Sequence, residues 1–243
     1  MTNYFQKLYK GSMKDFKALI KQDLQNNNKR FIVTANPEAF MLAKKNPDIN
    51  ELLLDENTTI VADGIGIVKG ADIVGINVTE RIPGIDIAEH LFSCGNELKK
   101  SIYLFGAKQE IIDALLELLA KRYKNLEVLG ASNGYVEDRD AVFKEIKSLQ
   151  PDIVLVALGM PAQERLIYKH LSDFNKGIFV GVGGSFDVLS NKKSRAPEFF
   201  IKHNIEWLYR ITKEPKRLKR FYDNNIKFIF SVKSLKRKLK CKK

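Results

Sequence analysis

The sequence predicts an α/β protein with a Rossmann-like, mostly parallel sheet that carries helices on both faces. Two observations favour this class: apolar, β-branched runs recur along the chain, and helical patterns separate them. Because the runs are apolar throughout and do not alternate with polar residues, they are typical of strands buried on both faces, as in a parallel sheet. The predicted strands are residues 30–35, 58–63, 101–106, 126–131, 152–159 and 177–183.

The clearest helical pattern is KQEIIDALLELLAKRY, residues 108–123, whose Ile and Leu side chains form a broad apolar face. Strand–helix alternation predicts right-handed crossovers between neighbouring parallel strands. The strand pattern stops near Ala196, where Pro197 suits the first turn of a helix, and helical patterns continue to the end. We therefore expect an α/β domain over residues 1–195 and a basic helical appendage over residues 196–243.

The excess positive charge of the chain lies in this appendage. From Trp207 to Lys243 there are 14 Lys or Arg and two acids, a net charge of +12 that equals the net charge of the whole chain. Such localised charge predicts one docking face for an anionic partner. The two cysteines, Cys94 and Cys241, lie far apart, which argues against a disulfide scaffold and fits a reducing compartment.

No membrane-crossing or targeting segment is expected. The start of the chain, MTNYFQKLYKGSMKDF, lacks the apolar core of a signal peptide. No apolar run approaches the roughly 20 residues that span a bilayer. We therefore expect a cytoplasmic protein whose membrane contact, if any, is peripheral.

The residues that follow each predicted strand are candidates for a binding site, because parallel sheets bind ligands at the carboxyl ends of their strands. Small residues and glycines recur there, and they permit close approach of the backbone to a ligand. The helix N-termini that follow such turns suit phosphate, so a phosphate-bearing ligand is expected. The candidates are Thr34, Asn36, Asp63, Gly106, Tyr135, Gly159, Gln163, Glu164 and Asp187.

Two acidic features each allow two interpretations. Asp63 ends an apolar strand before a predicted helix, so it is either an N-cap or a general base that projects into the cleft. Asp138 and Asp140 form the Asp-x-Asp pattern that binds a divalent metal in many nucleotide-sugar transferases. Because the helix dipole favours acids in a first turn, we prefer a helix start for this pair. The histidines have no metal-ligand spacing, and ADGIGIVKG lacks the glycine spacing of a dinucleotide site.

The order of the motifs carries a family resemblance. TANPE is followed by ADGIGIV, ERIPGIDI, LFGAKQE, PDIVLVALGMPAQE, VGVGGSFDVLS, RAPEF and EWLYRITKEPKRLKRF. Together they resemble the bacterial WecG/TagA/CpsF glycosyltransferase family over about residues 31–222. The combination of GxPxQE with EWLYR, EPxR and a further Arg in this order is specific to that family.

This resemblance implies an inverting transferase in which residues 1–195 are catalytic. The implied donor is UDP-N-acetylmannosamine and the implied acceptor is undecaprenyl-diphosphate-linked N-acetylglucosamine, which would give the linkage-unit disaccharide lipid of wall teichoic acid. The alternative is a member that uses UDP-N-acetylmannosaminuronic acid or a UDP-hexose for another cell-surface polysaccharide. Neither a cofactor nor a metal is implied, and the enzyme would work on the inner face of the bacterial plasma membrane.

The resemblance also implies roles for individual residues. Asp63 would be the catalytic base, Arg81 would face the acceptor or the diphosphate, and Gln163 would contact the donor. The further implied substrate contacts come from Thr34, Asn36, Glu164, Arg210, Arg217 and Arg220. The three appendage arginines would close over the pocket. They would align on one side if the helix were continuous, although Pro215 interrupts the stretch.

Three functions for the appendage are considered. Aromatic residues among Lys and Arg, namely Trp207, Tyr209, Phe221, Tyr222 and Phe228, could stack on nucleic-acid bases. A seven-residue repeat of Leu218, Phe221, Phe228, Val232, Leu235 and Leu239, broken by Asn225, favours a homo-oligomer. Neither function explains the strand-end cluster. We therefore prefer docking on an anionic membrane surface, with apolar side chains in the headgroup region and no nucleic-acid partner.

Overall fold

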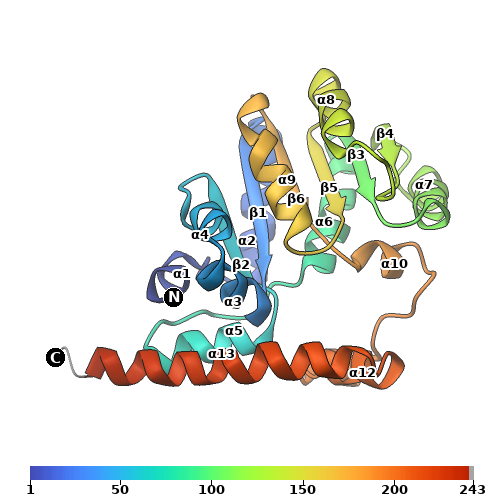
Figure 1. The fold of residues 1–243 in the computed structure, drawn as a ribbon. Helices are drawn as coiled ribbons and strands as arrows, with labels where there is room; N and C mark the ends of the chain where they lie inside the picture. The colour runs from blue at the N-terminus through green and yellow to red at the C-terminus, as the bar shows by residue number, and fades with distance from the viewer. Residues whose placement is uncertain (241–243) are drawn as a thin grey trace.

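The computed structural model describes residues 1–240 and contains a six-stranded parallel sheet with strand order β2-β1-β6-β5-β3-β4 (Figure 1). The strands are β1 (Lys29–Ala35), β2 (Thr58–Ala62), β3 (Ser101–Gly106), β4 (Glu127–Ser132), β5 (Ile153–Ala157) and β6 (Gly177–Gly181). The predicted fold class and all six predicted strands are confirmed. Within this range, the side chains of Arg217, Arg220, Leu239 and Lys240 lie outside the described part.

Helices cover both faces of the sheet. One face packs on α1 (Thr2–Lys7), α3 (Pro37–Lys45), α4 (Pro47–Leu54), α8 (Arg139–Leu149) and α9 (Ala162–His170). The other face packs on α2 (Met13–Gln25), α6 (Gly84–Glu97), α7 (Gln109–Arg122) and α10 (Ser185–Leu189). A short 3-10 helix, Leu171–Asp173, follows α9. The helix predicted over residues 108–123 is α7 and is confirmed.

Successive residues of a central strand point into opposite layers of the core. In β1, Phe31 and Val33 pack in one cluster and Ile32 packs in the other, and all three are fully buried. The edge strand β4 differs, because its residues are partly or fully exposed along its whole length. The expectation of burial on both faces is therefore wrong for β4, and its edge position alone does not explain this, because β2 at the other edge is largely buried.

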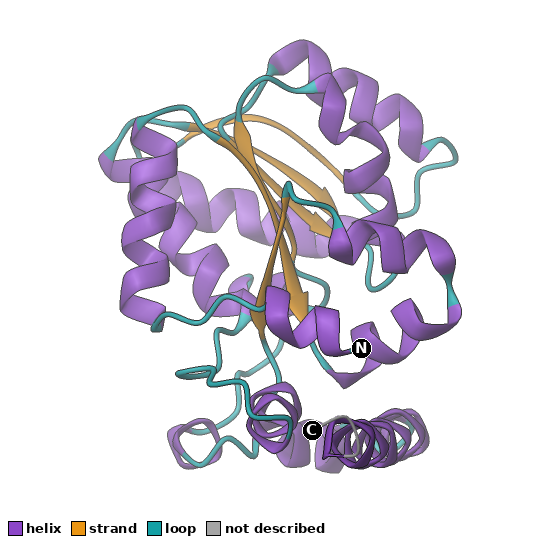
Figure 2. Cartoon of the chain, turned by 90° about the vertical axis from the view of Figure 1, so that its left-hand side faces the viewer, coloured by secondary structure: helices purple, strands orange, loops and turns teal. Residues whose placement is uncertain are grey.

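The chain after Ala196 is helical, as predicted, and comprises α11 (Glu198–Lys202), α12 (Glu206–Lys213) and α13 (Arg217–Lys240). Figure 1 and Figure 2 show these helices beyond the carboxyl end of the sheet, where α13 packs on α3 and on α5 (Ile65–Ile73). The Phe228 ring is buried 6.2 Å from the Phe5 ring and 6.4 Å from the Phe40 ring. The appendage thus shares the core of the body, and a division into two domains at residue 195 stays a prediction.

The structure bears on two hypotheses for the appendage. Phe228 and Val232 of the seven-residue repeat are buried against the chain's own body, so this stripe is not free to form a coiled coil with a second copy. The helix is also not continuous, because α12 ends at Lys213 before Pro215 and α13 begins two residues after it. Across the break, the Trp207 ring stacks on the Phe221 ring with 4.5 Å between centroids.

Candidate functional site

Asp63 directly follows β2 at the carboxyl edge of the sheet. The Ile82 amide donates to the Ala62 carbonyl at 2.7 Å and so returns the chain to this strand end. The Gly84 amide, at the start of α6, hydrogen-bonds to the Asp63 carboxylate, and a helix N-terminus favours negative charge. The N-cap of α5 is Gly64. The N-cap interpretation of Asp63 is therefore wrong, and its carboxylate faces other groups.

Those groups are charged side chains from the loop before α6 and from the appendage. Glu206 Oε2 lies 3.2 Å from an Arg81 guanidinium nitrogen, and Glu206 Oε1 lies 2.8 Å from an Arg210 guanidinium nitrogen. Burial raises the pKa of Asp63, while Arg210 and Arg81 oppose this rise and Glu206 adds to it. Two acids and two arginines thus form a charged cluster, which brings together the predicted residues Asp63, Arg81 and Arg210.

Thr34 and Asn36 lie at the neighbouring end of β1. Thr34 Oγ1 donates to the Gly181 carbonyl at 3.2 Å, and the Thr34 methyl group would be 3.2 Å from a Cβ added at Gly84. Asn36 is the N-cap of α3, since its Oδ1 accepts from the Ala39 amide at 3.0 Å. Both residues border the region of Asp63, and their contacts with a substrate stay predictions.

Gln163 joins the turns that follow β5 and β6. Its Oε1 accepts from the amides of Gly159 and Gly183, each at 3.0 Å, and its Nε2 donates to Glu164 Oε1 at 2.7 Å. The side chain is buried, and these bonds engage both the oxygen and the nitrogen of its amide group. Gln163 shapes the two turns, and a direct donor contact stays a prediction.

Glu164, beside Gln163 in the first turn of α9, is a buried acid whose second oxygen, Oε2, has no hydrogen-bond partner. Burial raises its pKa to about 7, the nearby Glu38 carboxylate adds to the rise, and the hydrogen bond from Gln163 opposes it. A carboxyl group in this position is protonated over much of the range below neutral pH. Glu164 therefore changes its protonation state near neutral pH, beside the two turns that Gln163 joins.

The remaining candidates lie at the end of β3 or follow β4 and β6. Gly106 has φ +124°, and a Cβ there would lie 2.4 Å from the Ala157 carbonyl oxygen, so only glycine fits. Tyr135 is 76% exposed, and Asp187 forms an ion pair with Lys193 at 3.3 Å. The structure places these residues along the same edge of the sheet, and their substrate contacts stay predictions.

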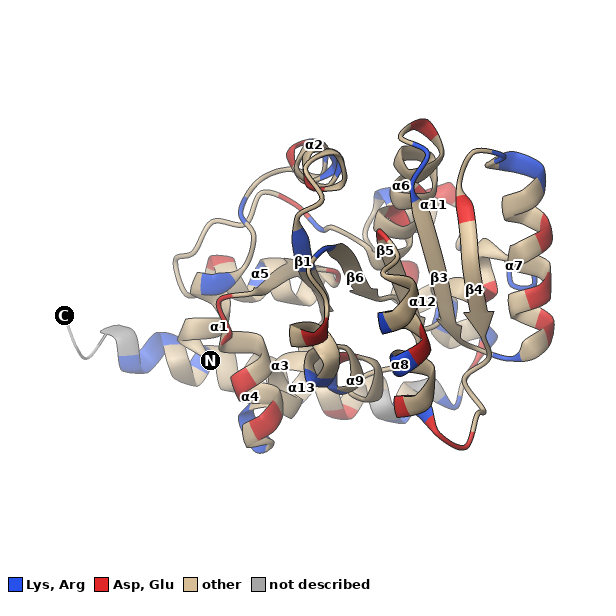
Figure 3. Ribbon diagram, turned by 90° about the horizontal axis from the view of Figure 1, so that it is seen from above, with Lys and Arg blue, Asp and Glu red and all other residues tan. Residues whose placement is uncertain are grey.

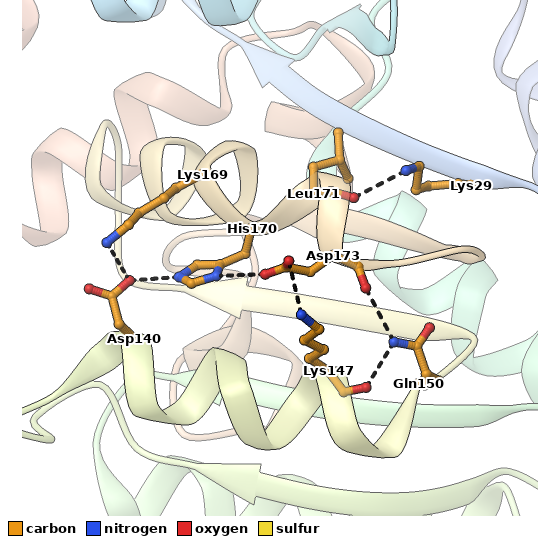
Figure 4. Close-up of polar contacts among 8 residues, drawn as sticks. All are labelled: Lys29, Asp140, Lys147, Gln150, Lys169, His170, Leu171 and Asp173. Carbon is orange, nitrogen blue, oxygen red and sulfur yellow. Dashed lines mark hydrogen bonds and ion pairs between the residues drawn. The ribbon is translucent and has the colours of Figure 1, made fainter.

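Asp138 and Asp140 begin α8, as preferred from the sequence. Asp138 accepts from the Asp140 and Ala141 amides, and Asp140 binds Lys169 at 2.8 Å and His170 at 2.6 Å (Figure 4). Both acids are therefore engaged in holding α8 and its contact with α9. Among residues 1–240, no group of three or more His, Cys, Asp or Glu side chains is arranged to hold a metal ion.

Two charged contacts were not predicted. Arg195 pairs with Asp86 at 2.6 Å and ties the start of the appendage to α6. Glu206, also not predicted, is the buried acid of the charged cluster. Its position four residues before Arg210 in EWLYR is a helical ion-pair spacing and could have identified it.

A groove adjoins the charged cluster. It has a volume of about 360 Å³ and is lined by Arg81 and Asp86 together with apolar side chains that include Ile65, Val68 and Ile201. A larger hollow of about 620 Å³ lies between α7 and β4, away from these charges. We take the charged cluster together with this groove as the candidate site, because Arg81 belongs to both. Within residues 1–240, every helix is too short or too polar to span a bilayer.

Comparison with known proteins gives concordant matches. Residues 4–243 match the model of the glycosyl transferase WecG/TagA/CpsF family. The chain is 40% identical over 189 residues, 78% of its length and 73% of the relative's, to N-acetylglucosaminyldiphosphoundecaprenol N-acetyl-beta-D-mannosaminyltransferase of Bacillus subtilis (strain 168). It is 36% identical over 217 residues, 89% of its length and 84% of the relative's, to the protein of the same name from Staphylococcus aureus (strain MW2).

Proposed function

This chain belongs to the glycosyl transferase WecG/TagA/CpsF family, and we propose that it transfers N-acetylmannosamine from UDP-N-acetylmannosamine to undecaprenyl-diphosphate-linked N-acetylglucosamine. The names of the relatives from Bacillus subtilis and Staphylococcus aureus describe this transfer. The product would be the linkage-unit disaccharide lipid of wall teichoic acid. The structural observation that carries the proposal is the acid Asp63 beside two arginines at the carboxyl edge of a parallel sheet.

Asp63 serves as the general base of an inverting, in-line displacement. Its carboxylate takes the proton of the acceptor hydroxyl, the new bond forms at the anomeric carbon, and the bond from that carbon to UDP breaks. A base is most effective when its pKa lies near the working pH, and burial moves the pKa of Asp63 in that direction. General base catalysis of this kind contributes roughly 10²- to 10⁴-fold to a rate.

The departing UDP carries developing negative charge that the site must stabilise. Arg81 and Arg210 face Asp63 from two different elements, and a guanidinium makes paired hydrogen bonds to phosphate oxygens. The Gly159 and Gly183 amides already donate to Gln163, so in this proposal the two arginines carry the stabilisation of the departing anion. The reaction so described uses only groups of the chain and needs no metal or cofactor.

Donor and acceptor approach Asp63 from different sides in this proposal. The donor lies across the two turns that Gln163 joins, which form the donor cradle, because their glycines Gly159 and Gly184 leave room for a diphosphate. The acceptor enters through the groove of about 360 Å³, where Arg81 would meet the diphosphate and the apolar side chains the prenyl chain, although Glu80 and Asp86 also line it. Asp63 lies between these two approaches.

Docking on an anionic membrane accounts for the exposed side chains of the appendage. Exposed apolar residues occur on all three of its helices, and Leu218, Tyr222 and Ile229 share one face of α13 at spacings of four and seven. Figure 3 shows Lys and Arg along the C-terminal part of the same helix. Stacking on nucleic acid is disfavoured, because Trp207 already stacks on Phe221 and Phe228 is buried. The enzyme would thus work as a peripheral protein on the inner face of the plasma membrane.

A donor panel tests the proposed reaction. The protein is incubated with a short-chain analogue of the lipid acceptor and, separately, with UDP-N-acetylmannosamine, its uronic acid form and several UDP-hexoses, and released UDP is measured. We expect release with UDP-N-acetylmannosamine that depends on the acceptor. Preference for the uronic acid form or a hexose would leave the transfer mechanism standing and replace the donor, whereas no release with any donor would refute the function.

A flotation assay tests membrane docking. We expect binding to vesicles that contain anionic lipid, no binding to zwitterionic vesicles, and steep weakening with added salt. The double variant Tyr222→Ser, Ile229→Ser removes two exposed apolar side chains of this face of α13 and should bind anionic vesicles less tightly. Leu149→Ser, which removes an exposed leucine of α8, is the matched control and should bind as the parent does. Equal binding of the double variant and the parent would contradict docking through this face.

A further inference from the structure

We propose that Glu206 is a positioning residue, which holds the guanidiniums of Arg81 and Arg210 beside Asp63 and so makes the site complete only when α12 is seated. This inference rests on the proposed function, in which Asp63 is the base. Glu206 makes no contact with substrate in this account. It acts through the two arginines, one from the loop before α6 and one from α12 itself.

The geometry of Glu206 differs from that of an ordinary surface acid. Only 6% of its side chain is exposed, yet both of its oxygens are paired, at 3.2 Å with Arg81 and at 2.8 Å with Arg210. Burial raises the pKa of Glu206, but Arg210, Arg81 and Arg195 outweigh this effect and hold the pKa below its usual range. A buried carboxylate is tolerated only with such partners, so the ionised Glu206 and the two arginines are placed as one unit.

This unit determines how the arginines meet the catalytic base. Among the side chains that the structure describes, both guanidiniums pair with Glu206, and no ion pair with Asp63 is formed. Direct pairing with an arginine would make Asp63 a weaker base, because a nearby positive charge favours the ionised carboxylate. Glu206 has the opposite influence and raises the pKa of Asp63. The arginines therefore stay near the reacting centre while Asp63 keeps its basicity.

The position of Glu206 links the unit to the appendage. Glu206 opens α12, and its neighbour Trp207 stacks on Phe221 of α13. Arg81 belongs to the body, so the ion pair between Arg81 and Glu206 spans from the body to α12. Displacement of α12 would remove Glu206 and Arg210 together and leave Arg81 without its partner. Seating of the appendage thus sets the charge around Asp63.

Paired charge-removing variants test this inference. Glu206→Gln keeps the shape of the side chain and removes its negative charge, so the pKa of Asp63 should fall. Arg210→Gln removes a positive charge, so the pKa of Asp63 should rise. Both shifts are read directly by carbon-13 NMR of Asp-labelled protein, with the Asp63 signal identified from Asp63→Asn. Glu198→Gln, at an exposed acid of α11, is the matched control and should leave the signal unchanged.

Kinetics and fluorescence complete the test. For Glu206→Gln we expect the acid limb of the kcat/KM profile to move to lower pH, and kcat to fall about tenfold because the base is weaker. UDP affinity should fall by less than kcat, because the two arginines act mainly on the negative charge that develops on UDP in the transition state. The emission of Trp207, the chain's single tryptophan, reports whether α12 remains seated in each variant.

The outcomes separate this inference from the proposed function. A parent-like Asp63 titration in Glu206→Gln would overturn the positioning role, and so would shifts of the same sign in Glu206→Gln and Arg210→Gln, because a general loss of structure and not charge would then explain both. A parent protein that turns over no UDP-sugar would overturn the proposed function. The NMR titration would still decide the role of Glu206 in that case.

Discussion

Two regions of the carboxyl edge of the sheet are built in different ways. After β5 and β6, the uncharged Gln163 holds two glycine turns by hydrogen bonds, and every contributing residue belongs to the body. After β2, the charged cluster draws Asp63 and Arg81 from the body but Glu206 and Arg210 from the appendage. The body alone therefore shapes the proposed donor cradle, whereas the charges around Asp63, the proposed base, require the appendage to be in place.

Asp63 and Glu164, the acids of these two regions, also differ in the charges around them. Burial raises the pKa of Asp63 and of Glu164 alike. Two arginines limit the rise at Asp63, whereas Glu164 faces a second acid, Glu38, which increases it. We therefore expect Asp63 to exchange protons during the reaction and Glu164 to hold its proton within the cradle. The variants below test this division, in order of decreasing effect.

The largest effect is expected for Asp63→Asn. The variant keeps the size of the side chain but cannot accept the acceptor's proton, so turnover should fall by roughly 10²- to 10⁴-fold. UDP affinity, measured by calorimetry, should be almost unchanged, because the cradle is intact. A rate within a few-fold of the parent would remove Asp63 from the role of base.

Phe228→Ala should produce the largest loss of stability. The ring is buried between α13 and the body, and truncation of a buried Phe costs about 3–5 kcal/mol. We expect a lower free energy of unfolding in urea, and a loss of turnover that exceeds the loss of UDP binding because α12 is less firmly seated. Phe230→Ala, at a 68% exposed position of the same helix, is the control and should lie within about 0.5 kcal/mol of the parent.

Gln163→Ala tests the uncharged region. Removal of the side chain leaves the Gly159 and Gly183 amides without their acceptor, and an unsatisfied buried group costs about 1–3 kcal/mol. Donor binding should weaken by a similar free energy in calorimetry, while the Asp63 titration stays as in the parent. The exposed Gln25→Ala is the control. Unchanged donor affinity in Gln163→Ala would separate the two turns from the donor site.

Glu164→Gln tests whether Glu164 is protonated in the folded protein. The folded-state pKa of about 7 lies above the ordinary value of 4.5, so the folded protein binds more protons than the unfolded chain between these values. The contribution of Glu164 to stability is therefore present below pH 4.5 and is lost as the pH rises to about 7. The glutamine variant should lose this part of the pH dependence in urea unfolding and be more stable than the parent above neutral pH. The same slope in both proteins would show that Glu164 is ionised.

The smallest effect on activity is expected at α8, outside both regions. Asp138→Ala removes an N-cap, which costs about 1 kcal/mol of stability, but it should leave turnover unchanged. Saturating EDTA should also leave turnover largely intact. Complete loss in EDTA that Mn²⁺ or Mg²⁺ restores would revive the metal-binding interpretation of Asp138 and Asp140.

Much of this architecture was predictable because local patterns carry it. Strands buried on both faces must be apolar throughout, so the central strands are visible in the sequence, and their ends identify Asp63 and Gln163 as site candidates. The edge position of β4 is not visible, because apolar content does not reveal how many neighbours a strand has. The N-cap interpretation of Asp63 was excluded only by the structure, in which Gly64 is the N-cap of α5 and the Asp63 carboxylate accepts from Gly84, which is distant along the chain.

The sequence by itself determined the class of sheet, the strand ends and the concentration of positive charge after Trp207, because each depends on residues that are adjacent or periodic in the chain. Tertiary structure alone decided which faces of the appendage are free. It buried Phe228 and Val232 against the body, left Leu218 and Tyr222 exposed, and brought Glu206 to Arg81 across 125 positions. Such choices depend on long-range packing and on the pairing of buried charges, and the free energy of both arises only when distant segments meet.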